Sequence, residues 1–358
     1  MNQPLLFSWK VHKICRGDWT MLQKWKLILS CLGFAVLVFD SKTAFQGAAD
    51  GINLCLQTII PSLFPFLFLS IIFIRGIAGQ CPTFMKRIGR ALGMPEGSEG
   101  FLFVGILGGY PSGAVCIAES YRCGQIKKDQ AEHLLGFCNN AGPAFIFGMA
   151  GSLFSVQAAW ALWIIHILSA LLASLLLPKY DTSATSVKVE CSSSSANALV
   201  YAIRNTAKIC GWVVLFRIFI GFSEKWFLWT FPEAIQCIFY GLLELSNGIC
   251  SLPCIESLPL RFLFFSAFLS IGGICILVQT KTAAEPLSLR WYLVGKLLQC
   301  FFSVIFSILL CPVLFPMSVP WIKAKSSIGL LVVTGFIVVF LIKKTVAFPS
   351  SIVYNKGK

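Results

Sequence analysis

The sequence Gly108-Gly109-Tyr110-Pro111-Ser112-Gly113 interrupts a hydrophobic stretch, because apolar residues fill 101–107 before it and 114–118 after it. Proline lacks an amide donor and costs about 3 kcal/mol in the interior of a helix. In hydrocarbon, each unsatisfied backbone group costs several kcal/mol more. Such an interruption persists only where protein or a water-filled cavity satisfies the backbone, and transporters place binding sites there. The motif therefore predicts a broken or re-entrant helix.

The composition is typical of a polytopic membrane protein. Of the 358 residues, 57% are hydrophobic and 12% are charged, whereas about 25% are charged in a soluble domain. The mean hydropathy is +0.80. The net charge of +14 comes from basic residues that lie mostly at the ends of apolar runs, the pattern of cytoplasmic loops beside anionic headgroups. We expect the lipid bilayer as a partner and no nucleic acid.

The apolar runs divide the chain into a first membrane half at 27–178 and a second at 198–348, separated by the Ser-rich linker 179–197. Basic residues before the first run place the segment 1–26 in the cytoplasm, and 349–358 forms a C-terminal tail. The runs predict an all-α polytopic membrane protein of about eight transmembrane helices plus re-entrant or broken helices. The expected spans include 27–39, 156–177, 198–222, 226–249, 260–279, 291–315 and 328–348, with an interfacial or inward-packed helix at 44–60.

Further interruptions occur in both halves. The first half has one at Pro61-Ser62-Leu63-Phe64-Pro65 and one at Cys138-Asn139-Asn140-Ala141-Gly142-Pro143. The second half has Glu244-Leu245-Ser246-Asn247-Gly248 and Ser270-Ile271-Gly272-Gly273, and the latter aligns weakly with Ile106-Leu107-Gly108-Gly109. Paired interruptions in two halves point to a transporter-type binding site. We therefore expect two weakly related halves whose breaks face each other across a polar cavity near the midplane.

The candidate solute-binding residues are small or polar side chains at these breaks. They are Gly109, Tyr110, Pro111, Ser112, Gly113, Asn139, Asn140, Ser246, Asn247 and Gln279. An amide side chain offers two donors and an acceptor, and backbone donors at a half-helix N-terminus attract anions. Two structural roles remain open: the asparagines could cap the adjoining helix, and the small residues could serve tight helix packing.

Two acidic residues are candidates for coupling to H⁺ or Na⁺, because intramembrane carboxylates are costly and functional by default. They are Glu119, which follows the first break, and Glu244. Glu119 could instead pair with Arg122, and Glu244 could end a helix. Lys296 is expected to extend to the interface, and His166 is expected to pack against a neighbouring helix and bond a carbonyl group.

The sequence does not favour an enzyme or a metal protein. It contains 15 cysteines but no CxxC pair, and only three histidines, so we expect no metal site and no cofactor. Cys250 and Cys254 form a weak candidate disulfide. We find no nucleophile elbow, phosphate-binding loop or HExxH motif, and therefore expect no catalytic residues.

Three motifs in order resemble a known family. They are Pro61-Ser62-Leu63-Phe64-Pro65-Phe66, then 108–114, then Phe137-Cys138-Asn139-Asn140-Ala141-Gly142-Pro143. They resemble the sporulation integral membrane proteins of the YlbJ type, as do the 244–248 run, Gly272-Gly273 followed by Gln279, and Gly295-Lys296-Leu297. The resemblance covers about residues 20–315. It implies the nucleoside-recognition, or Gate, domain group and a multi-pass protein of the cell membrane, including a spore, forespore or mother-cell membrane.

Together these features favour a transporter or channel for a small polar solute, nucleoside-like or other, that acts during sporulation. The alternative is a non-transporting membrane scaffold or assembly factor for spore cortex formation. Short loops leave little surface for a scaffold, which favours transport. A homo-oligomer stays open as a further partner.

Overall fold

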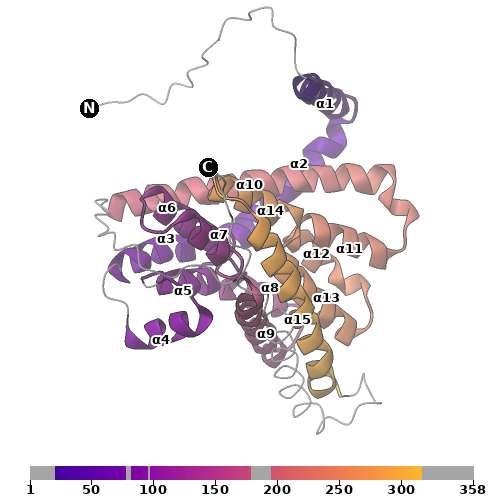
Figure 1. Ribbon diagram of the computed structural model, residues 1–358. Coiled ribbons are helices and arrows are strands. Elements are labelled where there is room, and N and C mark those ends of the chain that lie inside the picture. Colours follow the sequence, from indigo (N-terminus) through magenta and orange to yellow (C-terminus); the bar gives the residue numbers. More distant parts are fainter. Residues whose placement is uncertain (1–20, 78–81, 96, 179–194, 317–358) are drawn as a thin grey trace, which may run out of the picture.

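The computed structural model describes residues 21–77, 82–95, 97–178 and 195–316 (Figure 1). Throughout these ranges the regular elements are helices. Within the described residues, five stretches are long and apolar enough to cross a membrane, and they are Ser41–Leu69, Val156–Leu176, Ala198–Trp226, Leu258–Ala284 and Arg290–Leu314. The expected span 328–348, the tail 349–358 and most of the linker 179–197 lie outside the described residues. The total of eight spans and the kinship of the two halves stay predictions.

The first three helices run in sequence. Helix α1 (Met21–Phe39) contacts only α2 (Ser41–Leu54) appreciably and stands away from the other helices (Figure 1). A π-helical turn, Cys55–Ile59, then joins α2 to α3 (Ile60–Ile77). The expected break at Pro61–Pro65 is wrong, because the helix continues through both prolines. The wider π turn ends at Ile59, two residues before Pro61, and turns of this kind re-register the hydrogen bonds of a helix.

The helix expected at 44–60 as interfacial or inward-packed lies within the 41–69 candidate span, and the packing of α2 on α10 supports the inward-packed alternative. Its mild amphipathicity has a packing cause. A Cβ atom at Gly47 would lie 2.8 Å from the Cα of Ile218, and one at Gly51 would lie 2.9 Å from the Cα of Val214. Two glycines four residues apart let backbones approach closely, so α2 packs tightly along the long helix α10 (Ser195–Trp226).

Four helices are interrupted where the sequence predicts a break. In the first half, 108–111 separates α5 (Glu99–Leu107) from α6 (Ser112–Arg122), and 136–142 separates α7 (Lys128–Leu135) from α8 (Pro143–Ala150). In the second half, Glu244 separates α11 (Glu233–Leu243) from α12 (Leu245–Ser251). Gly272, at φ +78°, separates α13 (Leu258–Ile271) from α14 (Gly273–Ala284).

Continuous helices surround these broken ones. Helix α15 (Arg290–Leu314) packs against both α9 (Val156–Leu176) and α13, and also reaches α7. Helix α10 lies across one side of the molecule, with α2 along it (Figure 1). The remaining short elements are α4 (Thr83–Leu92) and two 3-10 turns, Leu228–Thr230 and Leu252–Cys254. The broken helices are thereby held between α10 on one side and α9 with α15 on the other.

Candidate functional site

A cavity of about 60 Å³ lies where the breaks of both halves meet. The first half contributes the 107–110 break, the 141–142 break and the start of α3, and the second contributes α10, α14 and the 244–246 break. The lining residues are Ile59, Ser62, Leu63, Leu107, Gly108, Gly109, Tyr110, Ala141, Gly142, Phe145, Ile209, Val213, Glu244, Leu245, Ser246, Ile276 and Gln279. Since one water needs roughly 10–15 Å³ by this measure, the space suits a few waters or a small polar group.

Glycines bring the two first-half breaks together at the cavity wall. Gly109 has a φ of +74°, a conformation that residues other than glycine rarely adopt. A Cβ atom at Gly142 would lie 3.0 Å from the Cα of Gly109. In addition, the carbonyl oxygen of Cys138 occupies the space that a Cβ atom at Gly105 or at Gly113 would need. The first-half wall is therefore built from backbone packed on backbone.

The second-half wall carries a buried carboxylate. Glu244 is 3% exposed and is the N-cap of α12. Its Oε2 accepts hydrogen bonds from the backbone N of Asn247 at 2.8 Å and from Nδ2 of Asn247 at 2.7 Å. A carboxylate at a helix N-terminus also interacts favourably with the helix dipole. The helix-end role left open for Glu244 is thus present, and the same side chain lines the cavity.

The predicted site residues fall into two groups. Gly109, Tyr110, Ser246, Gln279 and Glu244 line the cavity. The others, Pro111, Ser112, Gly113, Asn139, Asn140, Asn247 and Glu119, are not among its lining residues. Pro111 lines a smaller recess with Gln279 and α10. Ser112 donates its hydroxyl hydrogen to the carbonyl oxygen of Gly108 at 2.8 Å. One backbone acceptor of the break is thereby bonded within the break itself.

Glu119 lies at the surface, away from the cavity lining. Its half-exposed carboxylate forms an ion pair with Arg122 at 3.4 Å, which is the alternative that the sequence left open. Arg122 also donates to the carbonyl oxygens of Ala283 and Glu285. The candidate disulfide is absent, because Cys250 and Cys254 are both free.

Asn139 and Asn140 connect different parts of the molecule. Oδ1 of Asn139 accepts from the backbone N of Ala114 at 3.4 Å, and its Nδ2 donates to Oγ1 of Thr280 at 3.1 Å, so it joins α6 to α14. Asn140 is 1% exposed and donates from Nδ2 to the carbonyl oxygen of Phe137 at 2.6 Å. Its Oδ1 faces α15. Both side chains are used in packing the break.

The expectation that Lys296 extends to the interface is wrong, because this side chain is only 3% exposed. Its Nζ donates to Gln299 Oε1 at 2.7 Å, Tyr110 Oη at 3.0 Å and Asn140 Oδ1 at 3.2 Å. A close approach of Gly295 to the Gly136 carbonyl brings α15 against the 136–142 break. Lys296 is the seventh residue of α15, and its side chain points inward. This position is too far from the helix end for Nζ to reach the membrane interface.

Gln299 and His166 complete this polar cluster. Nε2 of Gln299 donates to Asn140 Oδ1 and to the carbonyl oxygen of His166, each at 3.0 Å. The His166 ring accepts at Nε2 from the backbone N of Ala141 at 3.0 Å. Lys296 and Gln299 are three residues apart on an apolar helix, and this i, i+3 spacing of polar residues was the available signal for a shared buried face.

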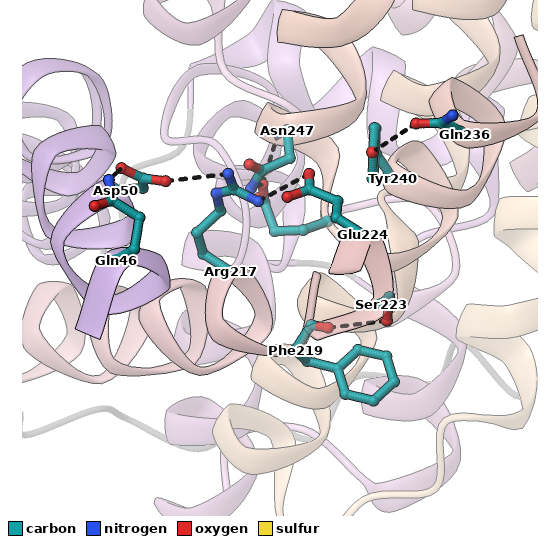
Figure 2. A network of polar contacts seen from close by, with 10 residues as sticks. Gln46, Asp50, Arg217, Phe219, Ser223, Glu224, Gln236, Tyr240 and Asn247 are labelled. Carbon is teal, nitrogen blue, oxygen red and sulfur yellow. Dashed lines mark hydrogen bonds and ion pairs between the residues drawn. The ribbon is translucent and has the colours of Figure 1, made fainter. Parts of the chain in front are cut away.

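A second polar cluster joins α2 to α10. Arg217 lies between two carboxylates, at 3.1 Å from Asp50 Oδ2 and 3.2 Å from Glu224 Oε1 (Figure 2). Nearby, Lys225 bonds Asp40 at 2.7 Å and thereby lowers the pKa of that carboxyl group. These side chains are not among the cavity lining residues. They fix the packing of α2 on α10, and α10 contributes Ile209 and Val213 to the cavity lining.

Comparison with known proteins gives one relevant similarity. Over 116 residues the chain is 31% identical to the sporulation integral membrane protein YlbJ of Bacillus subtilis (strain 168), an alignment that covers 32% of this chain and 28% of that relative. The match thus spans less than a third of the relative's length. No protein-family model and no solved structure matches the chain. The match confirms the resemblance to the YlbJ type and, with the apolar helices, supports a sporulation-associated integral membrane protein.

Proposed function

We propose that this protein moves a small polar solute across a membrane during sporulation, through the cavity between its broken helices. The observation that carries the proposal is the convergence of interruptions from both halves on one cavity. Irregular backbone at membrane depth is tolerated where it is buried in protein or lines a cavity, and transporter sites are built from discontinuous helices. The polar groups on an otherwise apolar lining include Ser62, Tyr110, Glu244, Ser246 and Gln279, which suits recognition of a polar solute.

The first test is ligand-induced thermal stabilisation of the purified full chain in detergent. The panel contains nucleosides, nucleobases, amino acids, dicarboxylates and divalent metals. A ligand at about 100 times its Kd adds about 2.7 kcal/mol to the native state. Ser246→Ala and Gln279→Leu should lose the shift, whereas Ser251→Ala should keep it. Ser251 lies on the same helix as Ser246 but bonds the Gly248 carbonyl and does not line the cavity.

No shift across the panel, together with normal sporulation in cells carrying Ser246→Ala and Gln279→Leu, would contradict transport and favour the scaffold. The same result would remove the nucleoside-like solute from consideration. A shift that all three variants retain would place the binding site outside this cavity.

We assign coupling to H⁺ or Na⁺ to Glu244 rather than Glu119. Glu244 is buried at the cavity wall, whereas Glu119 is half exposed and paired with Arg122. In proteoliposomes loaded with the solute that the panel identifies, Glu244→Gln should abolish dependence of uptake on an ion gradient. Glu119→Gln should leave that dependence intact, and the opposite result would reverse the assignment.

A further inference from the structure

Nζ of Lys296 has as many oxygen partners as an ammonium ion has N–H donors. A protonated lysine has three N–H donors and no acceptor, and Nζ has three oxygen partners, on Tyr110, Asn140 and Gln299. A neutral amine would turn its lone pair towards one of these oxygens. The three bonds match the three donors of an ammonium ion.

The surrounding groups are oriented to accept from this ion. Tyr110 donates its own hydroxyl hydrogen to the Leu269 carbonyl at 3.0 Å, so its oxygen is left to accept. The amide nitrogens of Asn140 and Gln299 likewise donate elsewhere, to the carbonyl of Phe137 and that of His166. Nε2 of Gln299 also donates to Asn140 Oδ1 within the cluster, and the oxygens of Tyr110, Asn140 and Gln299 accept from Nζ.

The ammonium is neutralised by no acidic side chain. In the part of the chain that the structure describes, the ion pairs formed by carboxylates do not include Lys296. Its ionisable neighbours are the phenols of Tyr110 and Tyr292, whose ring centroids lie 4.8 and 5.7 Å from Nζ, the Cys138 thiol and the His166 imidazole. Neutral oxygens and aromatic faces thus hold the charge, as they hold a bound cation.

The position of the cluster in the fold is also that of a cation site. Phe137 lies just after the end of α7, and Leu269 lies in the last turn of α13. In transporters built from discontinuous helices, unwound carbonyls and the C-terminal ends of half-helices, which carry partial negative charge, hold the coupling cation. Here they are bonded to the side chains that hold the ammonium.

We infer that the Lys296 ammonium is a tethered cation, occupying a site of neutral oxygens that would otherwise take a free monovalent cation. Tyr110 joins this site to the cavity, because it lines the cavity and its hydroxyl accepts from Nζ. For transport, the inference means that the protein carries a fixed positive charge at this point and needs no Na⁺ there. This consequence rests on the proposed function. The binding property itself is independent of any solute.

The test compares the melting temperature of the purified full chain in Na⁺, K⁺ or methylammonium chloride with that in choline chloride, at equal ionic strength. All arms carry Glu244→Gln, which removes the carboxylate assigned to ion coupling, and this parent chain should show no cation-specific shift. Lys296→Ala should melt at a lower temperature and recover a few degrees, saturably, in Na⁺ or methylammonium. The control is Lys281→Ala, since Lys281 is exposed and donates to the Leu287 carbonyl at 3.1 Å. It should behave as the Glu244→Gln parent.

A folded, monodisperse Lys296→Ala that responds to cations no more than Lys281→Ala would overturn the inference, because a merely structural lysine leaves no cation site. Should Lys296→Ala fail to fold, the Glu244→Gln parent still decides, because a saturable Na⁺-specific shift there contradicts a site already filled. The solute panel with Ser246 and Gln279 variants is a separate experiment. A negative result in the solute panel can therefore be distinguished from a negative result in the cation test.

Discussion

At the scale of single residues, the Cys138 carbonyl group shows how closely the first-half breaks are packed. It lies against the Cα atoms of both Gly105 and Gly113, one on each side of the 108–111 break. Neither glycine needs a positive φ. Their requirement is space, which identifies packing as the reason for these small residues.

Gly113→Ala should therefore destabilise the protein, by about 1–3 kcal/mol as for an overpacked core. Gly148→Ala is the matched control, because a Cβ atom there meets nothing within 4 Å and alanine favours the helix. Melting temperatures of the two purified variants check this. Equal melting temperatures would show that the 136–142 segment moves aside without cost.

At the scale of elements, the α2–α10 pair depends on one cation shared by two carboxylates. The side chain of Arg217 is 19% exposed, that of Asp50 34% and that of Glu224 38%. Because the group carries one net negative charge, removing either carboxylate leaves a balanced pair. Removing the arginine leaves two like charges on apolar helices.

Arg217→Gln should thus lower stability more than Asp50→Asn or Glu224→Gln. We expect about 1–2 kcal/mol for the arginine, between the values for exposed and buried pairs, since water partly screens the group. Thermal unfolding of the three variants at low salt measures the order. A milder effect of Arg217→Gln than of either carboxylate substitution would contradict the shared-cation description.

Helix α7 introduces a pH dependence of stability. Burial lowers the pKa of His133 to about 4, below the ordinary value of about 6.5. The unfolded chain then binds the proton more readily, so this contribution is complete above about pH 6.5 and is lost as the pH falls towards 4.

A shift of this size corresponds to about 3 kcal/mol. His133→Gln should flatten the fall in melting temperature between about pH 6.5 and 4 relative to wild type. An unchanged slope would show that other groups titrate in this window.

At the scale of the whole molecule, the two halves are held together by buried contacts across the linker. Helix α15 packs against α7 and α9, and α10 packs against α3. A chain split within 179–194 should therefore assemble when both pieces are co-expressed. The first piece alone should be rapidly degraded, because Asn140 and Tyr110 then lack Lys296. Pull-down and limited proteolysis test this; a monodisperse, protease-resistant first piece would disprove the dependence.

The sequence predicted where the helices are interrupted better than it predicted which residues contact these interruptions. Local composition predicted the interruptions at 108–113 and 138–143 and placed Glu244 and Gln279 among the candidates. The prolines at 61 and 65 do not break the helix, since α3 begins at Ile60 directly after the π turn and continues through Pro65, and no local pattern predicts such a turn. The burial of Lys296 and Gln299 was not predicted, since apart from their mutual bond their partners lie 133–186 residues away. Such contacts depend on how helices pack rather than on neighbouring residues.

The separation of Lys296 from Asn140 also bears on biogenesis. These residues are 156 positions apart, and a ribosome adding about 5–20 residues per second needs about 8–30 s to make that length. During this interval the nascent break must enter the bilayer without its later partner. The hydrogen bond from Asn140 Nδ2 to the Phe137 carbonyl is local and can form at once. Oδ1 of Asn140 gains its partners only after α15 has been made. Membrane insertion of α15 would thus be the step that completes the first half, and a stalled chain would leave that oxygen exposed to quality control.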